Sequence, residues 1–245
     1  MQQAIDTFAD WSQRHPDCDL FIASNGYQPE GSILGQVGEF LAPHPVRYVR
    51  LWDGTIVPRA CGLYLVASDD ATVHTWYRAH ATSLPELTIH LPHDAWHFYE
   101  MAPPDRDALV NTLTTSPALG QWDNGVQLQR YAVTGGEGPG SLLGLALIWE
   151  VHDTPPKKRY HFFNHLLDKD GVLVAQADGP GVFSRYWQLG EFFVTWFDIA
   201  VPPDVPQGIY QLAIGLYDWP SLERSHLTDG RDSLPLASIE ILAGN

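Results

Sequence analysis

Apolar residues in the first hundred positions switch between helical spacing and short continuous runs. Helices are expected over residues 2–14, 30–41 and 71–81, where apolar side chains recur about one turn apart. Buried strands are expected at the apolar runs 19–24, 46–51, 62–67, 87–91 and 95–100. This alternation predicts a small three-layer α/β domain with a mostly parallel sheet over residues 1–101.

After residue 101 the helical spacing disappears, and short apolar runs are separated by Gly, Pro and Asp turns. Strands are expected over residues 126–133, 142–151, 160–167, 172–176, 192–199, 209–217 and 236–242. Asp168–Gly171 has the composition of a hairpin loop, and Pro202–Gly208 is a rigid connection that cannot belong to a central strand. The pattern predicts an antiparallel β-sandwich over residues 103–245, immunoglobulin-like or jelly-roll-like.

Charge narrows the range of partners. Fourteen Lys+Arg against 29 Asp+Glu give a net charge of −15, which disfavours nucleic acid and anionic lipid surfaces. We expect no direct membrane insertion, because no apolar run approaches the roughly 20 residues of a bilayer span. The start, Met1-Gln2-Gln3-Ala4, lacks the pattern of a signal peptide.

Cys18 and Cys61 are the two cysteines of the chain, and each precedes an expected strand. Their spacing does not match a thiolate metal site. A disulfide between them is possible, but we favour two buried thiols, because free cysteine commonly behaves as a small buried hydrophobe.

The sequence offers no pattern that defines a reaction. Gly31–Gly38 lacks the Lys-Ser/Thr of a phosphate-binding loop and lies within an expected helix. His90, His93 and His97 cannot share one helix face because Pro92 lies between them, so we expect surface histidines and not a zinc site. Serine and carboxylate patterns single out no hydrolase centre. We therefore expect no catalytic residue, no metal and no cofactor.

The second half nevertheless resembles a known family. The segments that carry the resemblance are Phe163–Gln176, Asp178–Pro180, Trp187–Glu191 and Val201–Asp218. They are similar to the C-terminal extracytoplasmic sandwich of bacterial membrane glycosyltransferases related to dolichyl-phosphate-mannose:protein mannosyltransferases. Tyr48–Gly54 and Gly62–Val66 resemble the α/β region of the same proteins.

The resemblance implies a non-catalytic accessory module on the cell-surface or periplasmic side. In that family, catalysis resides in a membrane-embedded portion that uses a lipid-linked sugar donor, so no catalytic residue is carried over to this chain. The expected partners are a glycan or an acceptor protein, and the membrane-embedded portion of the parent chain. Two alternatives remain: a free-standing secreted carbohydrate-active hydrolase, and a structural spacer.

A glycan site would combine flat aromatic rings with polar side chains. The sandwich segment has aromatic residues in or beside loops at Phe183, Tyr186, Trp187, Tyr217 and Trp219. We expect any ligand surface around Tyr186, Trp187 and Tyr217, with Asp178 and His165 as polar partners. The alternative is that these rings pack within the sandwich, as aromatic side chains commonly do.

Overall fold

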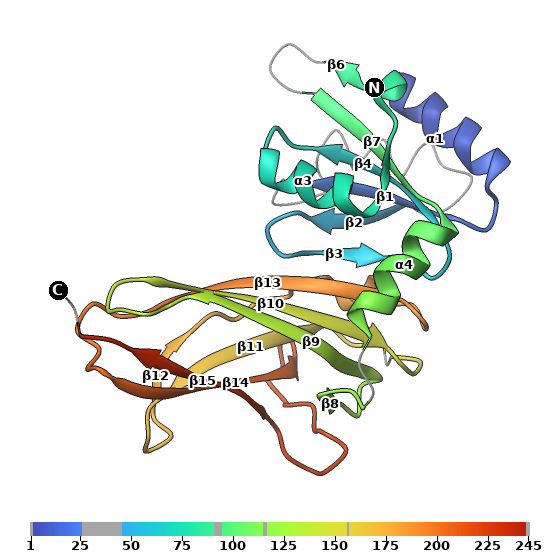
Figure 1. The fold of residues 1–245 in the computed structure, drawn as a ribbon. Coiled ribbons are helices and arrows are strands. Elements are labelled where there is room, and N and C mark those ends of the chain that lie inside the picture. Colours follow the sequence, from blue (N-terminus) through green and yellow to red (C-terminus); the bar gives the residue numbers. More distant parts are fainter. Residues whose placement is uncertain (1, 26–45, 91–94, 115–116, 156, 244–245) are drawn as a thin grey trace. The chain divides into compact units, whose positions relative to one another are not determined.

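The computed structural model describes residues 2–25, 46–90, 95–114, 117–155 and 157–243. It divides the chain into two domains, Met1–Leu113 and Thr114–Asn245 (Figure 1). The second domain is built mainly from sheet, whereas the first combines strands with helices. Within the part of the chain that the structure describes, the only helix of the second domain is a short 3-10 turn.

The first domain has a mixed sheet. Its elements are α1 (Gln2–Arg14), β1 (Asp19–Ser24), β2 (Val46–Arg50), β3 (Gly54–Val57), β4 (Gly62–Ala67), α3 (Ala71–His80), β5 (Thr82–Ser83), η2 (Pro85–Leu87), β6 (Ile89–His90), β7 (Ala95–Met101) and α4 (Pro103–Leu113). The order is β2-β1-β4-β7-β5, and β6 also pairs with β7. Only β2, β1 and β4 run parallel, whereas β7 is antiparallel to β4, β5 and β6. The expectation of a mostly parallel sheet therefore holds for three neighbouring strands and not for the rest.

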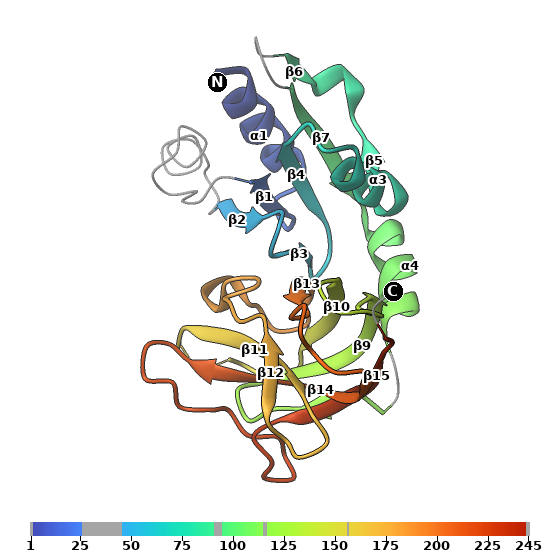
Figure 2. The same cartoon turned by 90° about the vertical axis from the view of Figure 1, so that its left-hand side faces the viewer.

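Helices α1 and α3 pack against opposite faces of β7. Phe98 contacts Phe8 of α1, with ring centroids 5.7 Å apart, and the next residue, Tyr99, contacts His74 of α3. Successive strand residues point to opposite faces, so each helix covers its own face (Figure 2). His74 is buried between Tyr99 Oη at 2.8 Å and the carbonyl of Ser68 at 2.6 Å, which satisfies both ring nitrogens.

The first domain also contains a helix that the sequence pattern did not predict. Pro103 and Pro104 were predicted to begin the sandwich segment, but they begin α4, because proline is tolerated in the first turn of a helix. Only Leu109 of α4 is buried, so the helix lacks the apolar stripe that would have revealed it. The expected helix over residues 30–41 lies outside the described residues.

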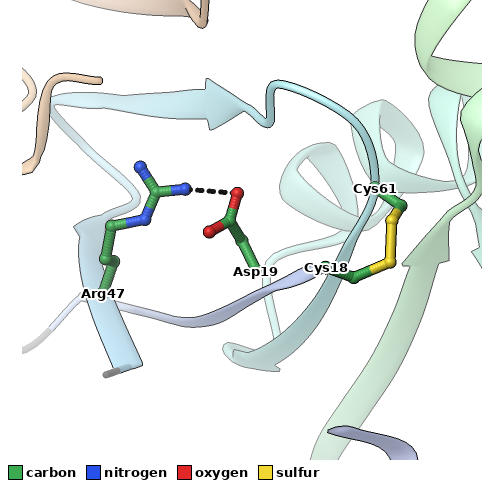
Figure 3. Close-up of a disulfide and its surroundings, with 4 residues drawn as sticks. All are labelled: Cys18, Asp19, Arg47 and Cys61. Atoms are coloured by element: carbon green, nitrogen blue, oxygen red, sulfur yellow. Dashed lines mark ion pairs between the residues drawn. A yellow bond between two sulfur atoms is a disulfide. The ribbon is translucent and has the colours of Figure 1, made fainter. Parts of the chain in front are cut away.

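A disulfide joins Cys18 to Cys61, which corrects our preference for two free thiols. These residues precede β1 and β4, and the first residues of the two strands, Asp19 and Gly62, are register partners. The Cα atoms of the cysteines are thereby brought to 4.8 Å. Beside the disulfide, Arg47 forms an ion pair with Asp19 at 2.8 Å (Figure 3). Burial raises the pKa of Asp19, and Arg47 opposes this shift.

The second domain consists of two antiparallel sheets. Its elements are β8 (Gly120–Gln121), β9 (Val126–Gly135), β10 (Leu142–Val151), β11 (Tyr160–Leu167), β12 (Leu173–Gln176), η3 (Ser184–Tyr186), β13 (Phe192–Ala200), β14 (Gly208–Asp218) and β15 (Leu234–Ile241). One sheet has the order β13-β10-β9-β8 within this domain, and the other has the order β12-β11-β14-β15 (Figure 1). The seven expected strands are all present, with β8 in addition.

Aromatic side chains fill the space between these two sheets. Trp149 of β10 and Phe193 of β13 face Phe162 of β11, with ring centroids 5.2 and 6.2 Å from that of Phe162. Trp187, which follows η3, stacks on Phe193 at 5.0 Å. Phe162 therefore points into the sandwich, and its neighbours His161 and Phe163 point out of it.

Removal of the disulfide should destabilise the first domain. A closed loop of 43 residues corresponds to about 4 kcal/mol in the chain-entropy treatment of cross-links. We expect Cys18→Ala/Cys61→Ala, or reduction of the native chain, to lower the free energy of unfolding of this domain by about 2–4 kcal/mol, measured in urea. The double variant should show no further loss with reductant. A native chain whose unfolding curve is unchanged by reductant would contradict the prediction.

Candidate functional site

Strand alternation places a row of aromatic rings on the outer face of the β12-β11-β14-β15 sheet. His161 of β11 is the register partner of Tyr217 of β14, and their ring centroids lie 5.6 Å apart. Trp219, just beyond β14, stacks on His161 with centroids 5.0 Å apart and planes 10° from parallel. Trp219 is 40% exposed, so part of its indole remains open to a ligand.

Polar groups lie beside these rings. Asp178, in the segment after β12, accepts a hydrogen bond from the backbone N–H of Asn164 at 3.4 Å. Its carboxylate lies 3.7 Å from Nε2 of His165, which shares the outer face of β11 with His161. Tyr217 Oη lies 3.5 Å from Nδ1 of His161. We call His161, His165, Asp178, Tyr217 and Trp219 the outer aromatic surface.

Phe163 lies on the same face but is covered. Its ring lies across Gly215, where a Cβ atom would approach the Phe163 ring to 2.3 Å. The guanidinium of Arg224 covers Phe163, 4.5 Å from the ring centroid, and forms a 2.7 Å ion pair with Asp232. Phe163 therefore anchors the surface and is not available to a ligand.

The protonation states of the outer aromatic surface follow from its partial burial. Burial lowers the pKa of His161 below the ordinary value of 6.5, Arg159 lowers it further, and Asp178 opposes both effects. Burial raises the pKa of Tyr217, and the charge of Asp178 adds to this shift. Near neutral pH the surface therefore presents the neutral imidazole of His161 and the phenol of Tyr217.

Three of the five predicted site residues meet on this surface: His165, Asp178 and Tyr217. His161 was not among the predicted site residues, and Trp219 was named only among the aromatic residues near loops. The signal for His161 was available, because a β11 strand that contains Phe162 and Phe163 requires His161 and His165 to share one face.

Trp187 and Tyr186 lie elsewhere. Trp187 is 6% exposed, stacked between Phe193 and Tyr160, and its indole N–H donates to the carbonyl of Val182 at 3.1 Å. Both faces of this ring are covered, so Trp187 packs in the core and presents no open ring face for stacking on a sugar. Tyr186 is half-buried in η3, where it contacts Arg185.

The histidines considered for a metal do not form a cluster among the described residues. His97 of β7 contacts the ring of His74 edge-on at 4.6 Å, whereas His90 is exposed on β6. His93 lies outside the described residues. The expectation that the chain binds no metal stays a prediction.

Comparisons with known proteins identify no family for the chain. No family model matches it, and no curated protein matches it. The resemblance to mannosyltransferases therefore stays a prediction.

Two of the solved structures that match are distant in sequence and in fold. The crystal structure of the C-terminal domain of wzt matches at a TM-score of 0.37 and 12% identity, over 54% of this chain and 81% of that chain. A family 123 glycoside hydrolase from Clostridium perfringens matches at a TM-score of 0.29 and 15% identity, over 44% of this chain and 22% of that chain. Similarity this low does not identify a ligand for this chain.

One structural finding bears on localisation. The disulfide fits an extracytoplasmic domain, because disulfides persist in oxidising compartments and are rare in the cytosol. Among the described residues, no helix has the length and apolar character that a bilayer span requires.

The contrast between the two tryptophans can be measured. Trp187→Ala should lower the free energy of unfolding of the second domain by about 3–5 kcal/mol, because it leaves a cavity between the sheets. Trp219→Ala should cost about 1 kcal/mol or less, since that ring is half exposed. Urea unfolding of both variants tests this. Equal losses would contradict the assignment of Trp187 to the core.

His161 should make the second domain sensitive to mild acid. Its pKa is lowered in the folded state, so between that value and 6.5 the unfolded chain binds more protons than the folded one. The stabilisation of the folded state by the neutral His161 is therefore complete above pH 6.5, and it is lost as the pH falls from 6.5 to the folded-state pKa. We expect His161→Gln to flatten the fall in unfolding free energy between pH 7.5 and 5, whereas His226→Gln, at an exposed side chain, should not. Parallel pH profiles for His161→Gln and the native chain would refute this.

Proposed function

We propose that the second domain binds carbohydrate on the outer aromatic surface. The observation that carries this proposal is the stacked pair of Trp219 and His161, flanked by Tyr217 and by the carboxylate of Asp178. Partly exposed rings next to fixed hydrogen-bonding groups are the combination that a sugar requires, because a pyranose has an apolar C–H face and a rim of hydroxyl groups.

The protonation states fit this role. Asp178 can accept hydrogen bonds from sugar hydroxyls, and Tyr217, whose pKa is raised, keeps its O–H as a donor at neutral pH. The neutral imidazole of His161 adds one donor and one acceptor. Tyr217 Oη lies 3.5 Å from Nδ1 of His161, longer than the roughly 2.6–3.2 Å of a nucleophile–base hydrogen bond, so binding is the function that the geometry supports best.

The affinity of one sugar ring should be low. The surface is open and covers little of a ligand, which still loses translational and rotational freedom on binding. A dissociation constant near 1 mM corresponds to only about −4 kcal/mol. Useful affinity then requires several sugar residues, or a tether that raises the local concentration of the glycan.

The wider role that we propose is an accessory module on the extracytoplasmic side of a membrane glycosyltransferase that uses a lipid-linked sugar. The disulfide supports an oxidising compartment, and the choice of this family rests on the sequence resemblance alone. In that setting, the domain would hold a glycan or a glycosylated acceptor protein near the membrane-embedded catalytic portion. The outer aromatic surface would bind the glycan, and the membrane-embedded portion would catalyse the transfer of the sugar.

A glycan titration tests the binding proposal. Neutral oligosaccharides, including mannose-containing ones, are added to the full chain, and indole N–H resonances are followed by NMR. Trp219→Ala and Tyr217→Ala should each weaken binding about tenfold, because each removes a ring worth roughly 1 kcal/mol or more. Trp52→Ala is the matched control, since Trp52 is 60% exposed and lies in the first domain. An oligosaccharide that binds the native chain and both second-domain variants equally would refute the assignment, as would a broad panel with no saturable binder.

A further inference from the structure

The second domain also has a pocket, beside the connection from β10 to β11, that differs chemically from the outer aromatic surface. It has a volume of about 530 Å³, within the range of small-ligand sites. One wall is the connection from β10 to β11, and the other is the segment that contains η3. The edge of Trp187 and the exposed side chain of Leu189 give it an apolar part.

Cations gather at this pocket. Four of the 14 Lys and Arg residues of the chain line it: Lys157, Lys158, Arg159 and Arg185. No acidic side chain is among the described residues that line it. Lys158 is partly neutralised by Asp218 at 3.8 Å and Glu223 at 3.6 Å, but these two carboxylates lie outside the lining. The pocket is therefore positive in a chain whose net charge is −15.

The two walls are joined by Ser184. Its hydroxyl donates to the carbonyl of Lys158 at 2.8 Å and accepts from the backbone N–H of Tyr160 at 3.0 Å. This places Arg185, the next residue, beside the basic segment. The guanidinium of Arg185 lies against the rings of Phe183 and Tyr186, at 4.9 and 4.7 Å, and donates to Tyr186 Oη at 3.2 Å. Arg185 is thus held in place before a ligand arrives, which lowers the entropic cost of using it.

Local charge outweighs the net charge inside this pocket. At physiological ionic strength the screening length is about 8 Å, so acidic residues far from the pocket contribute little there. An anion bound in the pocket would accept hydrogen bonds from the lysine and arginine side chains that line it. Such charge-assisted hydrogen bonds are roughly twice as strong as neutral ones. The net charge of −15 repels polyanions from the chain as a whole, but it does not prevent one anionic group from binding in this pocket.

We propose that this pocket binds the anionic group of an acidic sugar, a carboxylate or a phosphate. The apolar edge of Trp187 and the side chain of Leu189 would contact the sugar ring, and Arg185 and Lys157 would contact the charge. The pocket adjoins the outer aromatic surface, because the backbone N–H of Trp219 donates to the carbonyl of Arg159 at 2.7 Å. The choice of a sugar as the ligand rests on the proposed carbohydrate function, whereas the choice of an anion rests on the pocket alone.

The test is an NMR titration of the full chain with methyl glucuronide, glucose 6-phosphate, methyl glucoside and inorganic phosphate. The two anionic sugars represent the two sources of charge. We expect at least one of them to bind at least tenfold more tightly than methyl glucoside and inorganic phosphate, to shift the Trp187 indole resonance, and to bind more weakly as NaCl is added. Preference for the glucuronide would identify a carboxylate ligand, and preference for the sugar phosphate would identify a phosphate ligand; both results support the pocket.

Variants distinguish binding in this pocket from nonspecific attraction of an anion to surface cations. Lys157→Gln and Arg185→Gln should each weaken binding of the anionic sugar about tenfold, and Arg185→Lys, which keeps the charge, should recover part of that loss. Lys169→Gln makes the same change of charge at an exposed hairpin residue and should have no effect. Equal losses for Lys169→Gln and Lys157→Gln, no saturable binding of either anionic sugar, or equal binding of methyl glucoside would overturn the proposal.

The two binding proposals fail separately. If neutral oligosaccharides bind and respond to Trp219→Ala while no anionic sugar enters the pocket, the pocket proposal fails and the proposed function stands. If inorganic phosphate binds as tightly as glucose 6-phosphate, the pocket binds anions but the sugar assignment is wrong. If the anionic sugars bind and no neutral glycan does, the outer aromatic surface loses its proposed role.

Discussion

The packing of Phe162 against Trp149, Phe193 and Trp187 is the interaction on which the arrangement of the second domain depends. Side chains alternate along a strand, so a shift of β11 by one residue would turn its inward face outward. Burial of Phe162 makes that shift costly, and it thereby holds His161 and His165 on the outer face. The same aromatic cluster holds Trp187, whose edge lines the basic pocket.

The domain therefore presents two neighbouring surfaces with different electrostatic character. The outer aromatic surface combines aromatic rings with one acidic side chain, which suits uncharged hydroxyl groups. The basic pocket concentrates cations where Ser184 joins two connecting segments. Arg159 belongs to both environments, since its charge lowers the pKa of His161 and its side chain lines the pocket. An anion bound near Arg159 would weaken this effect, so occupancy of the pocket would raise the pKa of His161.

The sequence predicted strands better than it predicted surfaces. Apolar runs located β1, β4, β10 and β11 closely, because buried strands require continuous or alternating apolar residues. The pattern failed at α4, where one buried residue leaves no helical signature.

Exposure of individual rings was harder to predict, because it depends on contacts distant in sequence. Trp187 and Trp219 both lie near loops, yet one is covered by Phe193 and Tyr160 from other strands and the other is half open. The disulfide was missed for a similar reason. Only the pairing of β1 with β4 brings Cys18 and Cys61 together, and the spacing of the two cysteines in the sequence does not predict that pairing.

That cross-link has a consequence for the covalent integrity of the chain. The peptide between Cys18 and Cys61 includes β1, β2 and β3, and β4, which follows Cys61, lies beside β1 in the sheet. A protease that cut once anywhere in this segment would leave two fragments still joined through sulfur. The nicked molecule would migrate as one species on a non-reducing gel and as two on a reducing gel. Such a cut would leave the pairing of β1 with β4 tethered, so the first domain can tolerate a backbone break that would separate an unlinked chain.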